Sequence, residues 1–405
     1  MFLNRKVAKD TFYVGVNDRI KAKFENIIPI PKGVSYNSYL IVDEKIALID
    51  TVDICYGDLF VQKIKSQLNE KNIDYLIINH MEPDHSSSIS LIRKYYPSIT
   101  LVGNAKTLGM IEGYYGIDDN MLEIKDGEIL PLGLHQLQFH LTPMVHWPET
   151  MMTYDITTKT LFSGDAFGCF GALDGGVIDE EISVERYWDE MALYYANIIG
   201  KYGSPVQKAL QKLTPLEIEI ICPTHGPIWK EYIDKTVDIY DRMSRYEAKE
   251  GAVIAYGSMY GNTEQIAEAV AKGLVMGGIK NVVMHHVATV DSSVILKDIF
   301  KYKGLVIGSP TYCNDLHPEI DALIRKIENR GIKNRDFAYF GSFSWAGVAA
   351  KKLTTFAENM KWRTPDFSIE EKMGLKENNY QSSILLGKKL AELIRTEVEE
   401  DENCR

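Results

Sequence analysis

The chain has 405 residues, of which 45% are hydrophobic and 25% are charged, and its formal net charge is -11. This length favours two folded domains, and the composition is that of a globular protein and not of a disordered one. The negative charge, which includes the acidic end EVEEDENCR, argues against a nucleic-acid partner. No apolar run is long enough to span a membrane and the start MFLNRKVAKD lacks a secretory signal, so we expect a cytoplasmic protein.

The cysteines are far apart in the sequence, and no C-x-x-C pair occurs among them: Cys55, Cys169, Cys222, Cys313 and Cys404. This spacing argues against a disulfide framework and against a metal site built from four thiolates. We expect isolated buried thiols.

Strand-like and helix-like segments alternate along the whole chain, which predicts an α/β protein. In chain order the expected elements are a hairpin over 34–51, a helix over 59–69, a strand over 75–78, a helix ending at 96, strands over 137–142, 151–155 and 219–222, a long helix over 184–202, and a connecting helix over 230–250. A new buried strand, AVIAYG, follows Gly251 and starts a second series of strands and helices. We therefore place two domains at residues 1–250 and 251–405.

The segment HMEPDHS follows the strand over 75–78 and contains four potential metal ligands. His80, Glu82 and Asp84 alternate with period two, so an extended backbone would point all three to one side, and His85 opens the next helix. By itself such a cluster is also compatible with ordinary polar loop chemistry.

Three later polar residues stand in similar places, each after an apolar run and next to Gly or Pro. They are His146 in MVHWPETMM, Asp165 in LFSGDAFG and His225 in ICPTHGP. Because site residues of α/β proteins gather at strand ends, these segments predict one shared two-metal site. His135 and His140 lie near His146 but belong to a turn and a strand pattern, so we interpret them as structural or surface histidines.

The pattern H-x-[HE]-x-D-H, followed by a distant His, an Asp and a last His, resembles the metallo-β-lactamase fold. Most members of that superfamily have a third-position histidine and bind two zinc ions, whereas this chain has Glu82. Three carboxylates, two divalent ions and a bridging hydroxide would be nearly neutral together, and hard oxygen ligands favour iron or manganese over zinc. Glu82 is similar to the position that marks the flavodiiron proteins.

That resemblance implies a non-haem diiron centre with a hydroxide or oxide bridge between the ions. It assigns His80, Glu82 and His146 to one iron, Asp84, His85 and His225 to the other, and Asp165 as the bridge. Some relatives have the His85 equivalent turned away from the metal, which leaves its ligation open. Tyr194 and Tyr195 suit a core helix, but the resemblance places a tyrosine of this helix, Tyr195, near the irons.

In the second domain a hydroxyl-rich loop, SMYGNT, joins the strand AVIAYG to a helix with an apolar stripe. Such a helix start offers free amides and a favourable dipole to a phosphate, although simple helix capping explains the same residues. The loop has no Lys or Arg, and no Gly-x-Gly occurs in the chain, which excludes a Walker loop and a dinucleotide fingerprint.

Two further loops, SPTYCND and GSFSWAG, also follow strands and are rich in small and aromatic residues. Together the three loops resemble the phosphate loop and the ring-flanking loops of a flavodoxin, over roughly 251–395. The resemblance implies an FMN site with Tyr312, Phe343 and Trp345 beside the isoalloxazine. The candidate FMN residues are Ser258, Met259, Tyr260, Gly261, Asn262, Thr263, Ser309, Pro310, Thr311, Tyr312, Asn314, Ser342, Phe343, Ser344, Trp345 and Gly347.

Both halves together resemble the flavodiiron proteins over nearly the whole chain. The implied architecture is an N-terminal metallo-β-lactamase-like αββα sandwich followed by a flavodoxin-like, doubly wound parallel sheet. The implied activity is reduction of dioxygen to water, of nitric oxide to nitrous oxide, or of both, with electrons delivered through FMN. The alternatives are a dizinc hydrolase with a flavodoxin-like docking domain, and a flavin electron carrier without enzymatic activity.

The sequence does not rank the two gases, and it leaves the external electron donor open between rubredoxin, a reductase and a reduced deazaflavin. Two cofactor pockets on separate domains are expected to lie far apart in one chain. We therefore expect a head-to-tail homodimer, or a dimer of such dimers, in which flavin and metal sites of different subunits meet.

Overall fold

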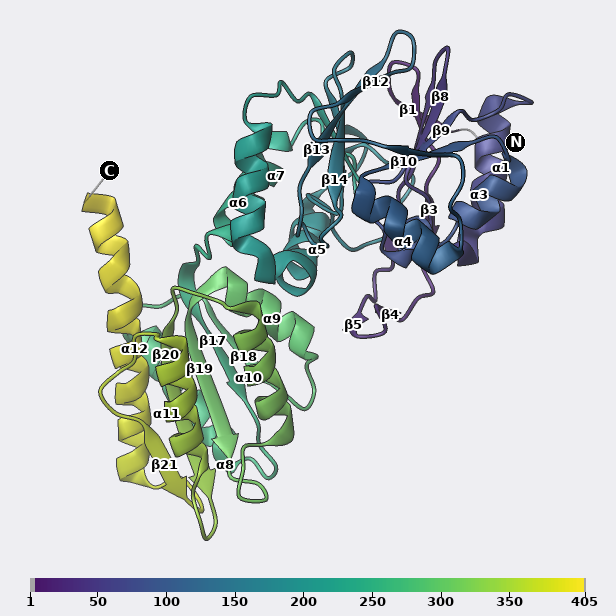
Figure 1. Ribbon diagram of the computed structural model, residues 1–405. Helices are drawn as coiled ribbons and strands as arrows, with labels where there is room; N and C mark the ends of the chain where they lie inside the picture. Colours follow the sequence, from purple (N-terminus) through teal and green to yellow (C-terminus); the bar gives the residue numbers. More distant parts are fainter. Residues whose placement is uncertain (1–3, 404–405) are drawn as a thin grey trace. The chain divides into compact units, whose positions relative to one another are not determined.

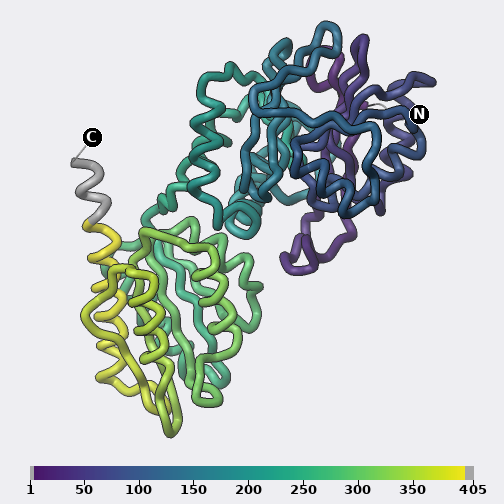
Figure 2. The backbone as a smooth tube through the Cα atoms, viewed as in Figure 1, coloured from purple at the N-terminus to yellow at the C-terminus, as the bar shows by residue number. Residues whose placement is uncertain are grey.

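The computed structural model describes residues 4–403, which divide into two compact units, 4–244 and 245–403. Figure 2 traces the chain through the first unit and then through the second. The division falls a few residues before the expected boundary. The first strand of the second unit already begins at Lys249, because Lys249 pairs with Tyr302 of a neighbouring strand.

The first unit contains two large β-sheets, of seven and five strands, and the strands of the seven-stranded sheet come first in the chain. The first has the order β1 (Arg5–Ala8), β2 (Thr11–Tyr13), β7 (Tyr39–Val42), β8 (Ile46–Ile49), β9 (Tyr75–Ile77), β10 (Thr100–Gly103), β11 (Met121–Glu123). The second has the order β12 (Ile129–Pro131), β13 (Gln136–Leu141), β14 (Met151–Asp155), β15 (Thr160–Gly164), β16 (Ile220–Pro223). Short pairs join β3 (Val16–Asp18) to β6 (Val34–Tyr36) and β4 (Lys23–Phe24) to β5 (Ile28–Pro29).

Helices cover the outer sides of these sheets (Figure 1). On the side of the first sheet lie α1 (Gly57–Leu68), α3 (Ile89–Tyr95) and α4 (Ala105–Tyr115), and on the side of the second lie α5 (Glu185–Tyr194), α6 (Gly203–Leu213) and α7 (Ile233–Ser244). Every residue of β14 and β15 is buried, as expected for strands covered on both faces. The unit is therefore the αββα sandwich that the sequence predicts.

The hairpin expected over 34–51 is confirmed for its second part, where β7 and β8 pair antiparallel and Val42 lies opposite Ile46. The preceding residues, Val34–Tyr36, pair instead with β3. The long helical stretch expected over 184–202 is present, but it is not one regular α-helix. Regular α-helix ends at Tyr194, a π-helical turn spans Tyr195–Ile199, and a 3-10 turn spans Gly200–Tyr202.

A local hydrogen bond explains part of this interruption. The side-chain amide of Asn197 donates to the carbonyl of Leu193 at 2.9 Å, within the last turn of α5. Such a bond competes with regular helical hydrogen bonding.

The extended backbone expected through Asp84 in HMEPDHS is wrong. A short helix, α2 (Pro83–Ser86), already includes Asp84, and Pro83 suits its first position.

The second unit is built on one parallel sheet in the order β18 (Val282–His286), β17 (Lys249–Tyr256), β19 (Tyr302–Pro310), β20 (Asp336–Phe343), β21 (Ile369–Lys372). Its helices are α8 (Asn262–Met276), α9 (Ser292–Lys301), α10 (Pro318–Arg330), α11 (Ala349–Met360) and α12 (Glu377–Asn403). Figure 1 shows α10 and α11 on the face opposite α8. This strand order, with the first strand inside the sheet, is the flavodoxin-like doubly wound type that the sequence predicts.

The core of this unit forms where α8 and α12 meet the sheet. Ile254 and Phe340 of the strands pack with Val270 of α8 and Leu390 of α12, and all four side chains are fully buried. Burial of such side chains contributes about 1.5–3 kcal/mol each to folding. This core fixes the carboxyl ends of β17, β19 and β20 along one edge.

The expectation of buried thiols holds for Cys169 and Cys222, whereas Cys55 and Cys313 are exposed. Cys404 lies outside the described residues. Within residues 4–403, no helix is long and apolar enough to cross a membrane.

Candidate functional site

The predicted metal ligands come from loops and one short helix at one edge of the two sheets in the first unit. His80 and Glu82 follow β9, and Asp84 and His85 lie on α2. His146 lies between β13 and β14, Asp165 follows β15, and His225 follows β16. Because β13, β15 and β16 run in the same direction, their ends meet at this edge.

A glycine shapes the turn after the last of these residues. Gly226 has a φ of 78°, and a Cβ atom at this position would lie 2.2 Å from the Sγ of Cys169. Only glycine fits this conformation and this close approach. The turn positions His225 against the backbone of Ser35, whose carbonyl accepts the Nδ1–H of His225 at 2.7 Å.

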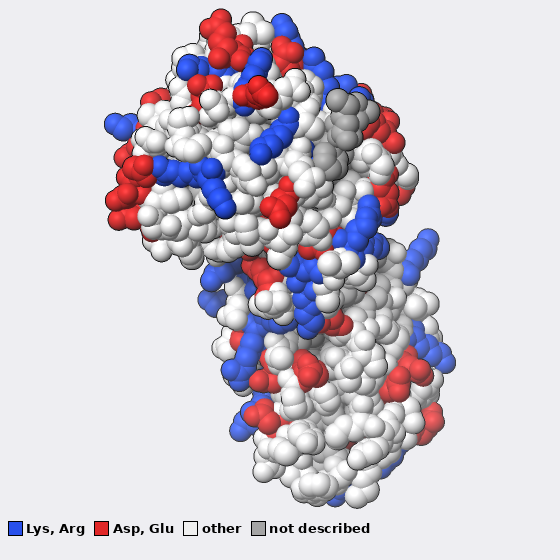
Figure 3. Space-filling model, turned by 90° about the vertical axis from the view of Figure 1, so that its right-hand side faces the viewer, with Lys and Arg blue, Asp and Glu red and all other residues white. Residues whose placement is uncertain are grey.

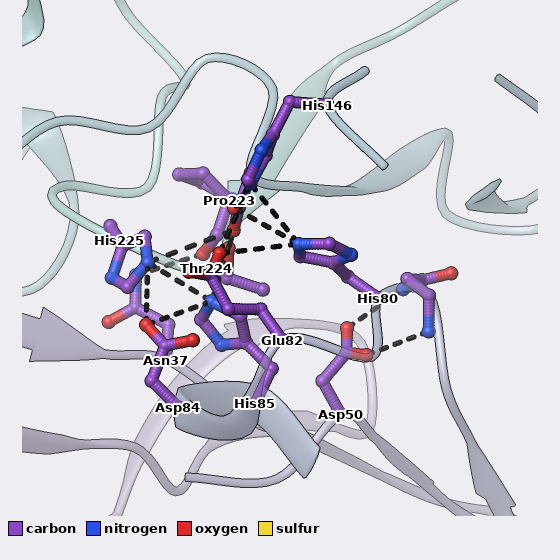
Figure 4. A network of polar contacts seen from close by, with 12 residues as sticks. Asn37, Asp50, His80, Glu82, Asp84, His85, His146, Pro223, Thr224 and His225 are labelled. Atoms are coloured by element: carbon purple, nitrogen blue, oxygen red, sulfur yellow. Dashed lines mark hydrogen bonds and ion pairs between the residues drawn. The ribbon is translucent and has the colours of Figure 1, made fainter. Parts of the chain in front are cut away.

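The seven predicted ligands are buried and form two groups, and the carboxylate of Asp165 lies beside both. Figure 4 shows the four histidines, Glu82 and Asp84 of these groups. In the first group, the Nε2 atoms of His80 and His146 are 3.2 Å apart. His146 Nε2 lies 3.1 Å from the Oε2 of Glu82 and 3.0 Å from the Oδ2 of Asp165.

The second group has the same construction. The Nε2 atoms of His85 and His225 are 3.0 Å apart, and they lie 3.4 Å and 3.3 Å from the Oδ2 of Asp84. His85 Nε2 also lies 3.0 Å from the Oδ1 of Asp165. Asp165 thus directs one oxygen to each group, and Thr224 Oγ1 donates to its Oδ1 at 2.6 Å.

The charges of this site are arranged for cations. Burial lowers the pKa of His146, but hydrogen bonds to Asp165 and Glu82 outweigh it and raise the pKa to about 9. Burial likewise opposes charge on His85, yet Asp84 and Asp165 raise its pKa to about 9. Burial opposes the charge of Asp165, whereas the histidines around it hold its pKa well below the usual range.

Two observations test whether metal ions fit here. Pairs of imidazole nitrogens face one another at hydrogen-bond distance in a buried place, which requires a proton or a cation between them. Among the described residues, the buried Oδ1 of Asp84 has no hydrogen-bond partner, and the buried Oδ2 makes no hydrogen bond beyond its 3.3 and 3.4 Å ion-pair contacts with the two histidines. Since buried polar atoms are rarely unpaired, this donor set fits two metal ions, and its three carboxylates favour iron or manganese over zinc.

The sequence singles out Tyr195, but the tyrosine in ring contact with a predicted ligand is its neighbour. The ring centroid of Tyr194 lies 5.5 Å from that of His225, and the Tyr194 hydroxyl is buried with no hydrogen-bond partner among the described residues. Tyr195 packs its ring against Tyr240 at 5.1 Å. The π-helical turn that begins at Tyr195 changes the helical register, which periodicity alone does not reveal.

Other groups around the site were not predicted. Glu149 accepts the Nδ1–H of His80 at 2.8 Å, and its place three residues after His146 is the available sequence signal. Partial loss of solvation and the charge of Glu82 raise the pKa of Glu25, on the β4–β5 hairpin, to about 7. His135 and His140 have the structural roles expected of them: His135 Nδ1 binds Asp155 at 2.8 Å, and His140 is buried beside Tyr154.

The candidate FMN residues gather at the ends of β17, β19 and β20, which are neighbours in the second sheet. Gly261 has a φ of 87° and precedes α8, whose start has no side-chain cap. Ser258 Oγ accepts the Gly261 N–H at 3.1 Å, which closes the loop. The amides that begin α8 therefore fit a phosphate group.

Hydroxyl groups tie these loops to one another. Thr263 Oγ1 and Ser342 Oγ are 2.9 Å apart, which joins the first loop to the third. Thr311 Oγ1 accepts the N–H of Val348 at 3.0 Å, which joins the second loop to the third. The Ser309 hydroxyl accepts the N–H of His317 at 2.9 Å.

Large aromatic side chains stand exposed on the same loops. Trp345 is 86% exposed and Tyr260 is 89% exposed, and Tyr312 is also exposed. The lower end of the second unit in Figure 3, where these loops lie, shows mostly uncharged side chains. Exposed rings around an uncharged phosphate loop fit a planar aromatic cofactor such as FMN. The remaining candidates lie at the same strand ends, on the same loops or at the start of α8: Met259, Asn262, Pro310, Asn314, Phe343, Ser344 and Gly347.

His286, at the end of β18, contacts the SMYGNT loop although it lies outside the three candidate loops. Its Nε2–H donates to the carbonyl of Ser258 at 3.0 Å, and its Nδ1 accepts the N–H of Ala288 at 3.2 Å. The first of these bonds connects the end of β18 to the SMYGNT loop. A histidine at a strand end does not by itself indicate such a contact in the sequence.

Comparison with known proteins agrees with this architecture. Residues 34–226 match the family model described as ODP family beta lactamase, and residues 254–379 match the model described as flavodoxin. The chain is 33% identical over 325 residues to a nitric oxide reductase of Moorella thermoacetica, which covers 80% of this chain and 81% of that protein.

Two solved structures are similar over nearly the full length. Rubredoxin oxygen:oxidoreductase of Desulfovibrio gigas has a TM-score of 0.94 at 27% identity, covering 98% of this chain and 100% of that one. The flavodiiron protein of Giardia intestinalis has a TM-score of 0.94 at 25% identity, covering 99% and 98%.

The fold and the buried carboxylate and histidine groups define an oxidoreductase that combines a lactamase-like metal domain with a flavodoxin domain. Its cofactors are FMN and a non-haem diiron centre. The chain belongs to the flavodiiron protein family.

Proposed function

We propose that this chain reduces dioxygen to water, nitric oxide to nitrous oxide, or both, in the cytoplasm, with electrons supplied through FMN. The observation that carries the proposal is the pair of buried ligand groups joined by Asp165, on the same chain as a flavodoxin-type sheet. The names of the Moorella and Desulfovibrio relatives support nitric oxide and dioxygen, respectively, as substrates.

In this proposal the domains meet near residue 250, and each predicted ligand keeps its role. His80, Glu82 and His146 would hold one iron, Asp84, His85 and His225 would hold the other, and Asp165 would supply a ligand to both. Bound iron would supply a place for the gas and single-electron chemistry, and FMN would supply the electrons one at a time.

The surrounding residues shape the space around the metal groups. Tyr194, Phe24 and Phe170 pack together beside His225, with ring centroids 5.0–6.5 Å apart, and form an apolar wall. Such a wall limits the access of water to this side of the site. Thr224 and Glu149 hold Asp165 and His80 in fixed orientations through their hydrogen bonds.

On the second domain the start of α8 and Ser258 bind the flavin phosphate, and Tyr312, Phe343 and Trp345 border the ring. The electron donor is an external protein or cofactor: rubredoxin, a reductase or a reduced deazaflavin. The name of the Desulfovibrio relative supports rubredoxin.

The working unit in this proposal is a head-to-tail homodimer, alone or as a dimer of dimers, in which flavin and metal sites of different subunits meet. Exposed apolar side chains near each site support it. Trp345 and Tyr260 stand exposed on the flavin loops, and Ile27, which is 57% exposed, stands on the hairpin that carries Glu25. Pairing of these surfaces would cover them.

Metal analysis with parallel gas assays tests the function. After anaerobic reduction, we expect protein with iron and FMN to consume dioxygen, nitric oxide or both when a donor is supplied. Two zinc ions per chain without gas consumption would favour a dizinc hydrolase. Electron transfer to a partner without loss of either gas would favour a flavin electron carrier.

A further inference from the structure

Glu149 is a fully enclosed carboxylate directed at one metal-site histidine. Its Oε1 lies 2.8 Å from the Nδ1 of His80, and neither side chain is exposed. The same oxygen accepts the N–H of Met81 at 2.9 Å. The other oxygen, Oε2, has no hydrogen-bond partner within residues 4–403. The carboxylate therefore accepts hydrogen bonds from His80 and from the N–H of the next residue, Met81.

The segment that carries Glu149 is held firmly in place. The Asn104 side-chain amide donates to the carbonyl of Glu149 at 2.6 Å. The next residue, Thr150, donates its hydroxyl to Thr142 at 2.6 Å, and Met151 donates its N–H to the Asn79 carbonyl at 3.0 Å. The loop that supplies His146 thus also orients His80 of the same ligand group.

The histidines of the second group have different partners. The Nδ1–H of His225 is accepted by a peptide carbonyl, that of Ser35, at 2.7 Å. The Nδ1 of His85 is buried and has no hydrogen-bond partner in the described chain. The two groups therefore differ in the atoms behind their histidines, although their Nε2 atoms are arranged alike.

This difference has an electronic consequence for bound iron. A carboxylate that accepts the outer N–H of a metal-bound imidazole raises the basicity of the coordinating nitrogen. A buried negative charge also stabilises the more positive oxidation state of a nearby metal. The neutral carbonyl behind His225 has a weaker effect of this kind, and no hydrogen-bond acceptor behind His85 provides it.

We propose, on the basis of the proposed diiron function, that Glu149 is a positioning residue that makes the two irons unequal. The iron held by His80, Glu82 and His146 has the lower reduction potential. It is the first to be oxidised and the last to be reduced. Asp165, which faces both groups, does not create this difference.

Two substitutions separate orientation from charge. In Glu149→Gln the amide oxygen still accepts the His80 N–H while the negative charge is lost. In Glu149→Ala both are lost. The matched control is Asp155→Asn, which changes a carboxylate bound to a buried histidine, His135, at the same 2.8 Å distance but outside both ligand groups.

The first measurement is a reductive titration of iron-loaded protein followed by electron paramagnetic resonance. We expect Glu149→Gln to keep its iron, to raise the lower of the two potentials and to narrow the gap between the steps. Asp155→Asn should leave both potentials unchanged, and Glu149→Ala should lose part of its iron. Unchanged potentials in an iron-replete Glu149→Gln protein would overturn the proposal.

A second measurement does not depend on iron or on gas reduction. In zinc-loaded protein labelled with ¹⁵N-histidine, the Nδ1–H proton of His80 should resonate far downfield in the wild type and in Asp155→Asn. It should move upfield in Glu149→Gln. The same resonance position in all three would contradict a charge-assisted bond from Glu149. If the His80 resonance moves as expected in zinc-loaded protein but the wild type binds no iron, the bond from Glu149 is supported and the proposed diiron function is contradicted.

Discussion

At the scale of single residues, Asp165 is the carboxylate that lies beside both ligand groups. Its Oδ2 lies 3.0 Å from His146 Nε2, and its Oδ1 lies 3.0 Å from His85 Nε2. A ligand from each group therefore depends on the same side chain. Loss of this carboxylate removes one negative charge and one donor atom from both groups.

We expect Asp165→Ala to retain FMN but to lose more than half of its iron, and gas reduction to fall by at least about a hundredfold. Metal analysis and gas electrodes measure both effects. Asp155→Ala is the control, because it removes a buried aspartate outside both ligand groups. Full iron content in Asp165→Ala would contradict the bridging role.

Some residues of the site follow from the sequence, and others do not, for physical reasons. His80, Asp165 and His225 follow apolar strands, and strand ends of a layered sheet converge, so their grouping could be predicted. Glu149 acts through a loop conformation that no periodicity encodes. Tyr194 is the last residue of α5, and the helical pattern over 184–202 conceals the π-helical turn that follows it.

At the scale of elements, we propose that the beginning of α8 binds the FMN phosphate. The parallel sheet and its helices were predictable from the apolar strands and the amphipathic helices between them. The contacts that join the loops, such as Thr263 with Ser342 and His286 with Ser258, link segments far apart in sequence. Hydroxyl and imidazole groups have many possible partners, so the sequence alone could not assign these pairs.

We expect the double substitution Asn262→Ala with Thr263→Ala to weaken FMN binding by at least about tenfold, because a charged phosphate loses polar donors. Flavin fluorescence after dialysis measures retention, and iron content should stay constant. Thr355→Ala is the control, since its hydroxyl bonds within α11. Loss of iron together with FMN would show that the two sites are not separable.

At the scale of the whole molecule, the head-to-tail dimer predicts complementation between two inactive chains. One chain carries Asp165→Ala, and the other carries Asn262→Ala with Thr263→Ala. Dissociated together and reassembled, they form mixed dimers in which one intact flavin meets one intact metal site. Gas reduction should return in the mixture, up to about a quarter of the wild-type level if half of the dimers are mixed and each has one working pair.

A tag on each chain provides the control, because it allows mixed dimers to be isolated and their gas reduction to be measured separately. Mixed dimers as inactive as their parents would show that electrons pass within one chain.

The reoxidation of reduced flavin by gas tests most directly whether electrons pass from FMN through the metal centre. Anaerobically reduced wild type and Asp165→Ala are each mixed with dioxygen or with nitric oxide in a stopped-flow instrument, and flavin absorbance is followed. We expect fast reoxidation by at least one gas in the wild type, without accumulation of hydrogen peroxide when that gas is dioxygen. In Asp165→Ala it should be at least about a hundredfold slower. Equal rates in the two proteins, or release of hydrogen peroxide by both, would show that the gas reacts at the flavin and would contradict a diiron reductase.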